Sequence, residues 1–210
     1  MNKLLLILIV PMLISSCVGK HSSDAQEANI GKAQKEQNSL TKDTLQVDIS
    51  NSSIHWKGTK MQGAGKHEGQ IQLRDGYFLT DQNKLVGGRF TMNMNTIQVT
   101  DIPEHEPVPR KRFNDHMKSK DFFYTAKYPT SEFTITEIND LTNDSILVSG
   151  NLTIKEITKS IKFKAKNKEK EFSTKFTFDR FEWNIAYEGS WADKTLVDSD
   201  IELIINLKIE

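Results

Sequence analysis

Three histidines are the side chains of this chain that most readily suggest metal chemistry. His105 lies between Glu104 and Glu106, whereas His67 and His116 lie on separate segments. Imidazole and carboxylate groups bind zinc, and a zinc-bound water would make the protein a hydrolase. The His-x-x-x-His and His-Glu-x-x-His spacings, which place two ligands on one helical face, do not occur in the sequence. A metal-dependent hydrolase is therefore the least supported functional hypothesis, and we expect no metal site.

Nucleophilic and phosphate-binding motifs do not occur in the sequence either. It has no Gly-x-Ser-x-Gly elbow and no glycine-rich phosphate loop, and Cys17 is its single cysteine. Nothing in these residues calls for an enzyme, so we expect a protein that binds its partner without catalysis and without a cofactor. The chain has 28 basic and 28 acidic residues, and this balance argues against nucleic acid as the partner.

The segment before Cys17 indicates a role for that cysteine. Lys3 is followed by an apolar run over residues 4–14, which is too short to cross a bilayer as a helix. Ile14-Ser15-Ser16-Cys17 resembles the bacterial lipobox, in which the cysteine is acylated and becomes the first residue of the mature protein. The alternative is an ordinary secretory signal with a coincidental cysteine. We predict a signal peptide over residues 1–16 and a bacterial envelope lipoprotein, periplasmic or surface-facing, that is anchored to the membrane through Cys17.

The next segment is polar. Residues 18–44 contain no aromatic side chain and only two aliphatic side chains larger than valine, Ile30 and Leu40. Such a composition buries too little apolar surface to offset the entropy of ordering, so we predict a flexible tether over residues 17–44. Residues 45–210 are long enough to form one domain with its own core.

Alternation with a period of two dominates this domain. Residues 201–209, for example, place isoleucine and leucine at every second position. About eight to ten such segments, separated by turn signals such as Asp75-Gly76 and Asn143-Asp144, predict an all-β antiparallel barrel or sandwich. One segment differs, because Arg110–Lys120 follows three prolines and has apolar residues at helical spacing. We expect it to form a short helix that covers one end of the sheet.

The block from Phe113 to Lys166 is the most distinctive part of the chain. It contains His116-Met117-Lys118-Ser119, Thr125-Ala126-Lys127-Tyr128-Pro129 and Gly150-Asn151-Leu152-Thr153-Ile154. In order and spacing it resembles the YceI-like family of bacterial lipid-binding proteins. The resemblance implies an eight-stranded antiparallel barrel similar to a lipocalin, with a long-chain apolar lipid such as an isoprenoid quinone or a polyprenyl lipid inside. Many family members carry Arg-Asp where this chain has Phe113-Asn114, so any ion pair made by that arginine is missing here.

Large apolar side chains on the predicted strands and helix are the candidates for the barrel lining. Phenylalanine and methionine suit contact with a flexible chain, although an inward phenylalanine in a small barrel is more often plain core. An open lumen would indicate a lipid carrier, whereas a filled lumen would indicate an envelope scaffold protein without a ligand. The candidate lining residues are Phe90, Met92, Phe113, Met117, Phe122, Phe133, Ile135, Phe163, Phe176, Phe178 and Trp183.

A charged lipid headgroup would need partners at the mouth of the barrel. Arg112, His116 and Lys118 lie on the predicted helix and are the candidates for this role. The oligomeric state is left open by the sequence, and a homodimer formed through a barrel edge is compatible with it.

Overall fold

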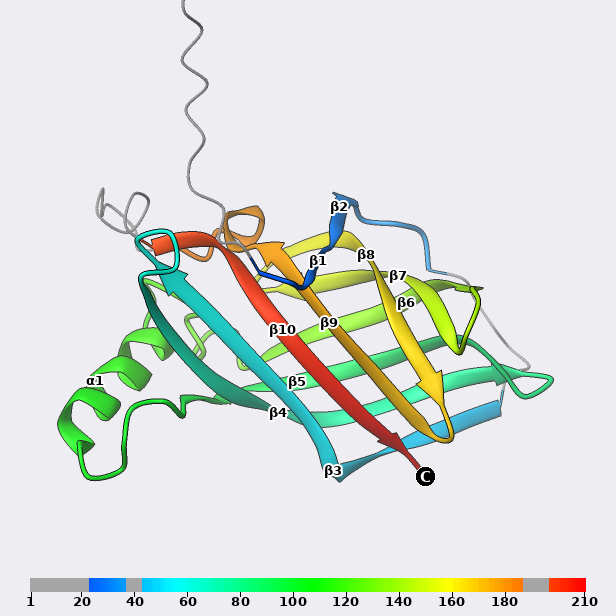
Figure 1. Cartoon of the computed structure of the whole chain (residues 1–210), viewed down its shortest axis with the longest axis horizontal. Coiled ribbons are helices and arrows are strands. Elements are labelled where there is room, and N and C mark those ends of the chain that lie inside the picture. The colour runs from blue at the N-terminus through cyan, green and yellow to red at the C-terminus, as the bar shows by residue number, and fades with distance from the viewer. Residues whose placement is uncertain (1–22, 37–42, 187–196) are drawn as a thin grey trace, which may run out of the picture.

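The computed structural model describes residues 23–36, 43–186 and 197–210, which form a closed β-barrel with one α-helix (Figure 1). Each barrel strand pairs antiparallel with the next, and the last strand returns to pair with the first. These strands are β3 (Asp43–Lys60), β4 (Gly65–Asp81), β5 (Lys84–Val99), β6 (Thr130–Asp140), β7 (Ser145–Ile154), β8 (Ile157–Lys168), β9 (Glu171–Asp179) and β10 (Val197–Ile209). The predicted eight-stranded antiparallel barrel with one short helix is confirmed.

The strands form where apolar and polar residues alternate. In β8, Phe163 and Ala165 are buried, while Lys164 between them is exposed. Tight turns join several strands, because Gln82-Asn83 and Glu169-Lys170 have positive φ at both residues, as two-residue type I′ hairpins require. The alternation therefore sets which face of each strand is buried, and the turns set the pairing.

Asp75-Gly76 is not a turn, contrary to the prediction from the sequence. The dipeptide lies inside β4, between two irregularities in its pairing with β5. A Cβ atom on Gly76 would lie only 2.9 Å from the ring of Phe90. Glycine is needed here because a large core ring packs against the strand, not because the chain reverses.

β8 and β9 form only a short ladder with each other. Their pairing covers Lys166–Lys168 of β8, next to the turn that joins the two strands. Beyond this point the gap between them is covered by residues 23–36, which we call the strap (Figure 1). Within the strap, β1 (Gln26–Glu27) pairs parallel with β9, and β2 (Asn29–Lys32) pairs antiparallel with β8. The strap therefore closes the seam between β8 and β9.

Gln26 fastens the strap where β8 and β9 diverge. Its side-chain oxygen accepts a hydrogen bond from the N–H of Lys164 at 2.7 Å. Its amide nitrogen donates to the carbonyl oxygen of Lys164 at 2.6 Å and to that of Lys175 at 3.3 Å. The carboxamide thus takes the place of a peptide group in the interrupted ladder.

The prediction of a flexible tether over residues 17–44 is wrong for the strap. Its polar groups complete the hydrogen bonding of the barrel, so its order does not depend on burying a large apolar area. Further along the strap, the backbone of Gln34 exchanges two hydrogen bonds of 2.8 Å with the side chain of Asn151. Cys17 and the predicted signal peptide lie outside the described residues.

The helix α1 (Pro107–Lys118) begins before the predicted Arg110. Pro107 and Pro109 fit its first turn, where backbone N–H groups have no intrahelical partner. Asn114 holds the helix against β5, because its side-chain oxygen accepts a hydrogen bond from the N–H of Val99 at 2.8 Å. Among the described residues, no helix combines the length and the apolar character needed to cross a membrane.

Phenylalanine rings from five barrel strands cross the lumen in contact with one another. Successive ring centroids are 4.4–6.4 Å apart. Ile146 and Val148 of β7 are also buried, but they do not border the cavity described below. The rings belong to Phe78, Phe90, Phe133, Phe163, Phe172 and Phe176, and we call this set the aromatic layer.

Candidate functional site

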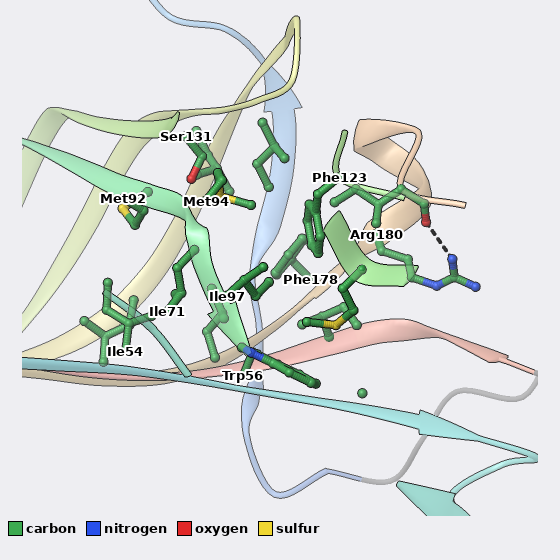
Figure 2. Close-up of a pocket in the computed structure, with 18 of the residues that line it drawn as sticks. Ile54, Trp56, Ile71, Met92, Met94, Ile97, Phe123, Ser131, Phe178 and Arg180 are labelled. Carbon is green, nitrogen blue, oxygen red and sulfur yellow. Dashed lines mark hydrogen bonds between the residues drawn. The ribbon is translucent and has the colours of Figure 1, made fainter. Parts of the chain in front are cut away.

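A cavity of about 500 Å³ lies in the lumen between the aromatic layer and α1. Sites that enclose a small organic ligand typically measure about 300–1,000 Å³. Figure 2 shows Ile54, Ile71 and Met92 grouped at one side of this space, with Phe123 and Arg180 toward the other. Most of the lining is aliphatic or aromatic, so the cavity suits a hydrocarbon chain.

Strand register brings the wall residues to the same level. Leu203 of β10 pairs with Trp56 of β3 on one side and with Phe176 of β9 on the other. Because directly paired residues point to the same face of a sheet, all three side chains point inward, and all three line the cavity.

The end wall comes from α1 and the loop that follows it. Phe113 stacks on Trp56 with the ring centroids 6.3 Å apart, and its centroid lies 4.4 Å from that of His67. Met117 is buried, and Phe122 and Phe123 contact each other edge to face at 5.1 Å. The helix therefore contributes apolar side chains to the cavity rather than shielding it from a distance.

Arg180 contributes a fully buried cation to the lining. Its guanidinium donates hydrogen bonds to the carbonyl oxygens of Ile185 at 2.5 Å and Asp198 at 3.1 Å. It is the first residue of the 3₁₀-helix η1 (Arg180–Trp183). Asp179 caps this helix, because its carboxylate accepts a hydrogen bond from the N–H of Phe181 at 2.8 Å. Burial raises the pKa of Asp179 above its usual value.

The structure places nine of the eleven predicted lining residues at the cavity. They are Phe90, Met92, Phe113, Met117, Phe122, Phe133, Phe163, Phe176 and Phe178. Their contact with a lipid stays a prediction.

The other two predicted lining residues, Ile135 and Trp183, are buried but do not border this cavity, and their contact with a lipid likewise stays a prediction. Ile135 lies two residues further along β6 than Phe133 and pairs with Gly88 of β5 and Gly150 of β7. Trp183 packs edge to face on Phe178, and its N–H donates to the carbonyl oxygen of Leu152 at 3.1 Å. Alternation identified them as inward-facing without showing which part of the interior is open.

The predicted headgroup residues do not act together. His116 lines the cavity, whereas Arg112 is exposed and neither Arg112 nor Lys118 borders it. A helix turns by about 100° per residue, so Arg112 and Lys118 lie about 100° or more around α1 from Phe113. The structure therefore places only His116 at the cavity, and a headgroup contact by any of the three residues stays a prediction.

The histidines considered for metal binding lie apart from one another. The Nδ1 atom of His67 is 3.1 Å from the carboxylate of Asp101. The side chain of His105 is 82% exposed, and the ring of His116 lies beside that of Phe122. In the part of the chain that the structure describes, no group of three or more His, Cys, Asp or Glu side chains is arranged to hold a metal ion. The metal-dependent hydrolase hypothesis thus finds no site among these residues.

Several lining residues were not named from the sequence. Alternation in β3 and β10 could have identified Ile54, Trp56, Leu203 and Ile205, because each lies on the apolar face of its strand. Arg180 carries no such signal, since nothing in the local pattern distinguishes it from an exposed arginine at the end of a strand.

Comparison with known proteins gives the family. The model of the YceI-like domain matches residues 45–209. A UPF0312 protein of Shewanella denitrificans is 31% identical over 97 residues, which cover 46% of this chain and 47% of that protein. The protein YceI of Escherichia coli O157:H7 is 31% identical over 93 residues, or 44% of each chain. These alignments span less than half the length of the curated relatives.

Two solved structures share the fold. BcnA of Burkholderia cenocepacia has a TM-score of 0.60 at 20% identity, covering 77% of this chain and 98% of that one. A polyisoprenoid-binding domain from Saccharophagus degradans, implicated in plant cell wall breakdown, has a TM-score of 0.56 at 12% identity, covering 79% and 97%. At such identities the likeness concerns the fold alone. The family model, however, spans nearly every residue of the barrel, and on that match the chain belongs to the YceI-like family.

Proposed function

We propose that this protein binds one long-chain apolar lipid, of the isoprenoid or acyl type, reversibly inside its barrel. The observation that carries the proposal is the apolar cavity of about 500 Å³ in a closed barrel. The function is sequestration or transport, with no bond made or broken. A packed scaffold without a ligand would need a filled lumen, and the cavity disfavours it.

The energetics of binding favour an enclosed cavity over a surface patch. Association costs about 4–15 kcal/mol in lost freedom, while each buried methylene contributes about 0.8 kcal/mol. A ligand must therefore bury on the order of ten carbons before binding becomes favourable by this mechanism. Met92, Met94 and Met117 in the lining can adjust to the shape of a flexible tail.

The comparisons support an isoprenoid tail in particular. The Saccharophagus degradans domain that shares this fold is described as polyisoprenoid-binding. Transferring that ligand class to this chain is part of the proposal.

The proposed setting is the bacterial cell envelope. Residues 1–16 would be removed on export, and acylation of Cys17 would attach the barrel to a membrane. Mass spectrometry of the protein purified from its native membrane checks this directly. A diacylated N-terminal Cys17 is expected, and an unmodified or internal Cys17 would contradict the anchor.

Native mass spectrometry of the chain without its first 17 residues tests the lipid proposal, because this form retains every described residue. The protein is expressed in bacteria, is never delipidated, and its bound material is then extracted and identified. A stoichiometric adduct with an isoprenoid or acyl signature is expected. A bare polypeptide mass, together with failure to take up polyprenyl lipids or fatty acids, would contradict the proposal.

Two variants of β10 provide a matched pair for this experiment. Leu203→Trp adds a large ring to the cavity wall and should abolish the adduct. Ile204→Trp makes the same kind of change one residue along, where the side chain is 36% exposed, and should retain it. Equal loss of the adduct in both variants would indicate that the ligand is not held in the cavity.

A further inference from the structure

The ionisable residues in the lining of the cavity all carry the same sign of charge when protonated. The described lining contains Lys60, Lys66, His67, His116 and Arg180 but no aspartate and no glutamate. A carrier for an uncharged hydrocarbon needs none of these side chains. Arg180 already donates to backbone carbonyl oxygens and His67 faces Asp101, so the two lysines are the basic lining residues that we consider for contact with the ligand.

The two lysines lie at one end of the cavity, beside the turn between β3 and β4. Lys60 is the last residue of β3, and Lys66 follows the first residue of β4. Both lysines are exposed and also line the cavity, so the cavity reaches the surface here. We call this end the mouth.

Gly65 helps to position Lys60 at the mouth. The two residues are paired across β3 and β4, and a Cβ atom on Gly65 would lie 2.6 Å from Cε of Lys60. The absence of a side chain at position 65 therefore gives the stem of Lys60 room to lie across the turn. The ammonium group has no hydrogen-bond or ion-pair partner among the described residues.

Three acidic side chains lie near the mouth. Asp101 contacts His67 and the N–H of Glu68 rather than either lysine, and neither Glu68 nor Asp198 blocks access to the lysines. Lys66 pairs with Glu68 at 3.1 Å, but the two side chains are 55% and 45% exposed, and such surface pairs are weak. Asp198 is buried and turned toward the β3–β4 turn. Its carboxylate accepts hydrogen bonds from the hydroxyl of Thr59 at 2.5 Å and from the N–H groups of Gln62 and Gly63 at 3.0 and 3.1 Å.

We propose that the mouth binds an anionic headgroup, so that the ligand is an amphiphile with a long apolar tail and a terminal carboxylate or phosphate. This inference rests on the proposed lipid-binding function and deepens it. Lys60 and Lys66 bind the headgroup at the mouth, and the tail enters the cavity. A neutral headgroup such as a quinone ring or an alcohol gains no comparable attraction from these lysines.

Displacement of a fluorescent apolar probe by tail-matched ligands tests the inference. Hexadecanoate is compared with hexadecanol, and farnesyl phosphate with farnesol, on the chain without its first 17 residues. Each anion is expected to bind at least about tenfold more tightly than its alcohol, a difference that corresponds to about 1.4 kcal/mol. The anion with the larger gain in affinity over its own alcohol identifies the headgroup as a carboxylate or a phosphate.

The variant Lys60→Gln/Lys66→Gln should reduce this preference to less than about threefold, while binding of the alcohols stays unchanged. The control is Lys166→Gln, an exposed lysine of β8 next to the β8–β9 turn, which should leave the preference intact. Thermal melting checks that each variant is folded.

The outcomes separate this inference from the proposed function. Alcohols that bind as tightly as the anions would overturn the anionic headgroup while supporting lipid binding. A preference for anions that survives in the double lysine variant would overturn the assignment to Lys60 and Lys66. If neither anions nor alcohols displace the probe, the proposed function itself fails.

Discussion

The seam between β8 and β9 provides the sharpest test of the fold, and Gln26→Ala is the change that probes it. The substitution removes hydrogen bonds of 2.7 and 2.6 Å to the N–H and carbonyl of Lys164 and a longer one of 3.3 Å to Lys175. One intramolecular hydrogen bond contributes about 0.5–1.5 kcal/mol net. Since water can reach these partly exposed groups, we expect the free energy of unfolding to fall by about 1–2 kcal/mol.

Gln26→Glu should cost more than Gln26→Ala. The carboxylate keeps an acceptor for the N–H of Lys164, but it cannot donate to the two carbonyl oxygens and instead places a negative charge beside them. Urea denaturation measures both losses, and an unchanged slope with denaturant indicates that only stability has changed.

Hydrogen exchange gives a readout at the seam itself. The amide of Lys164 donates to Gln26 in the folded protein, so Gln26→Ala should expose it. We expect its exchange to accelerate at least about tenfold relative to amides of the β7–β8 ladder, which keep their partners. Gln72→Ala, at an exposed position of β4, is the control and should change neither quantity. Protection of the Lys164 amide that persists in Gln26→Ala would refute this account of the seam.

Further changes test packing, a buried hydrogen bond and a buried charge. Gly69→Ala should lower the free energy of unfolding by about 1–3 kcal/mol in denaturant melts, because the added Cβ would lie 1.9 Å from a carbonyl oxygen of β5. Gly31→Ala is the control: a Cβ there has no atom within 4 Å, so stability should change by less than about 1 kcal/mol. In the same assay, Trp183→Phe should lower the free energy of unfolding by about 1–2 kcal/mol more than Trp56→Phe. The indole N–H of Trp183 has an acceptor, whereas that of Trp56 is buried without one among the described residues. Equal losses would contradict this reasoning. Since burial raises the pKa of Asp179, the folded state loses stability as pH rises from the unfolded value toward the folded one. Asp179→Asn should therefore gain stability over the natural chain at pH 7.5 and gain less near pH 4, and urea midpoints that show no such trend would refute the shift.

The barrel could be predicted from the sequence because each strand buries one face locally. Alternation over residues 201–209 is visible without knowledge of any other strand, and the helix follows from Phe113 and Met117 at a spacing of four. The same alternation identified Phe90 and Met92 as inward-facing. It could not show that the lumen is open beside them, because that depends on how far apart opposite walls of the barrel lie.

The strap and Arg180 could not be predicted for a different reason. Gln26 and Lys164 are separated by 138 residues, and a polar segment that completes a distant ladder has the composition of a disordered one. Arg180 is buried where the carbonyl oxygens of Ile185 and, 18 residues along the chain, Asp198 accept its hydrogen bonds. Both features depend on long-range hydrogen bonds, which leave no periodic pattern in the chain.

The strap also determines how mechanical load would enter the barrel. With Cys17 acylated as proposed, six residue steps separate the anchor from Ser23, a maximum span of about 20 Å. Ser23 hydrogen-bonds Glu202 of β10, and Asp24 pairs with Lys175 of β9 at 2.5 Å. The segment that follows the anchor therefore first contacts the barrel at β9 and β10. A pull from the membrane would then act first on these two contacts and next on the Gln26 hydrogen bonds that close the seam. Tension on the anchor and opening of the barrel wall would thus be mechanically coupled.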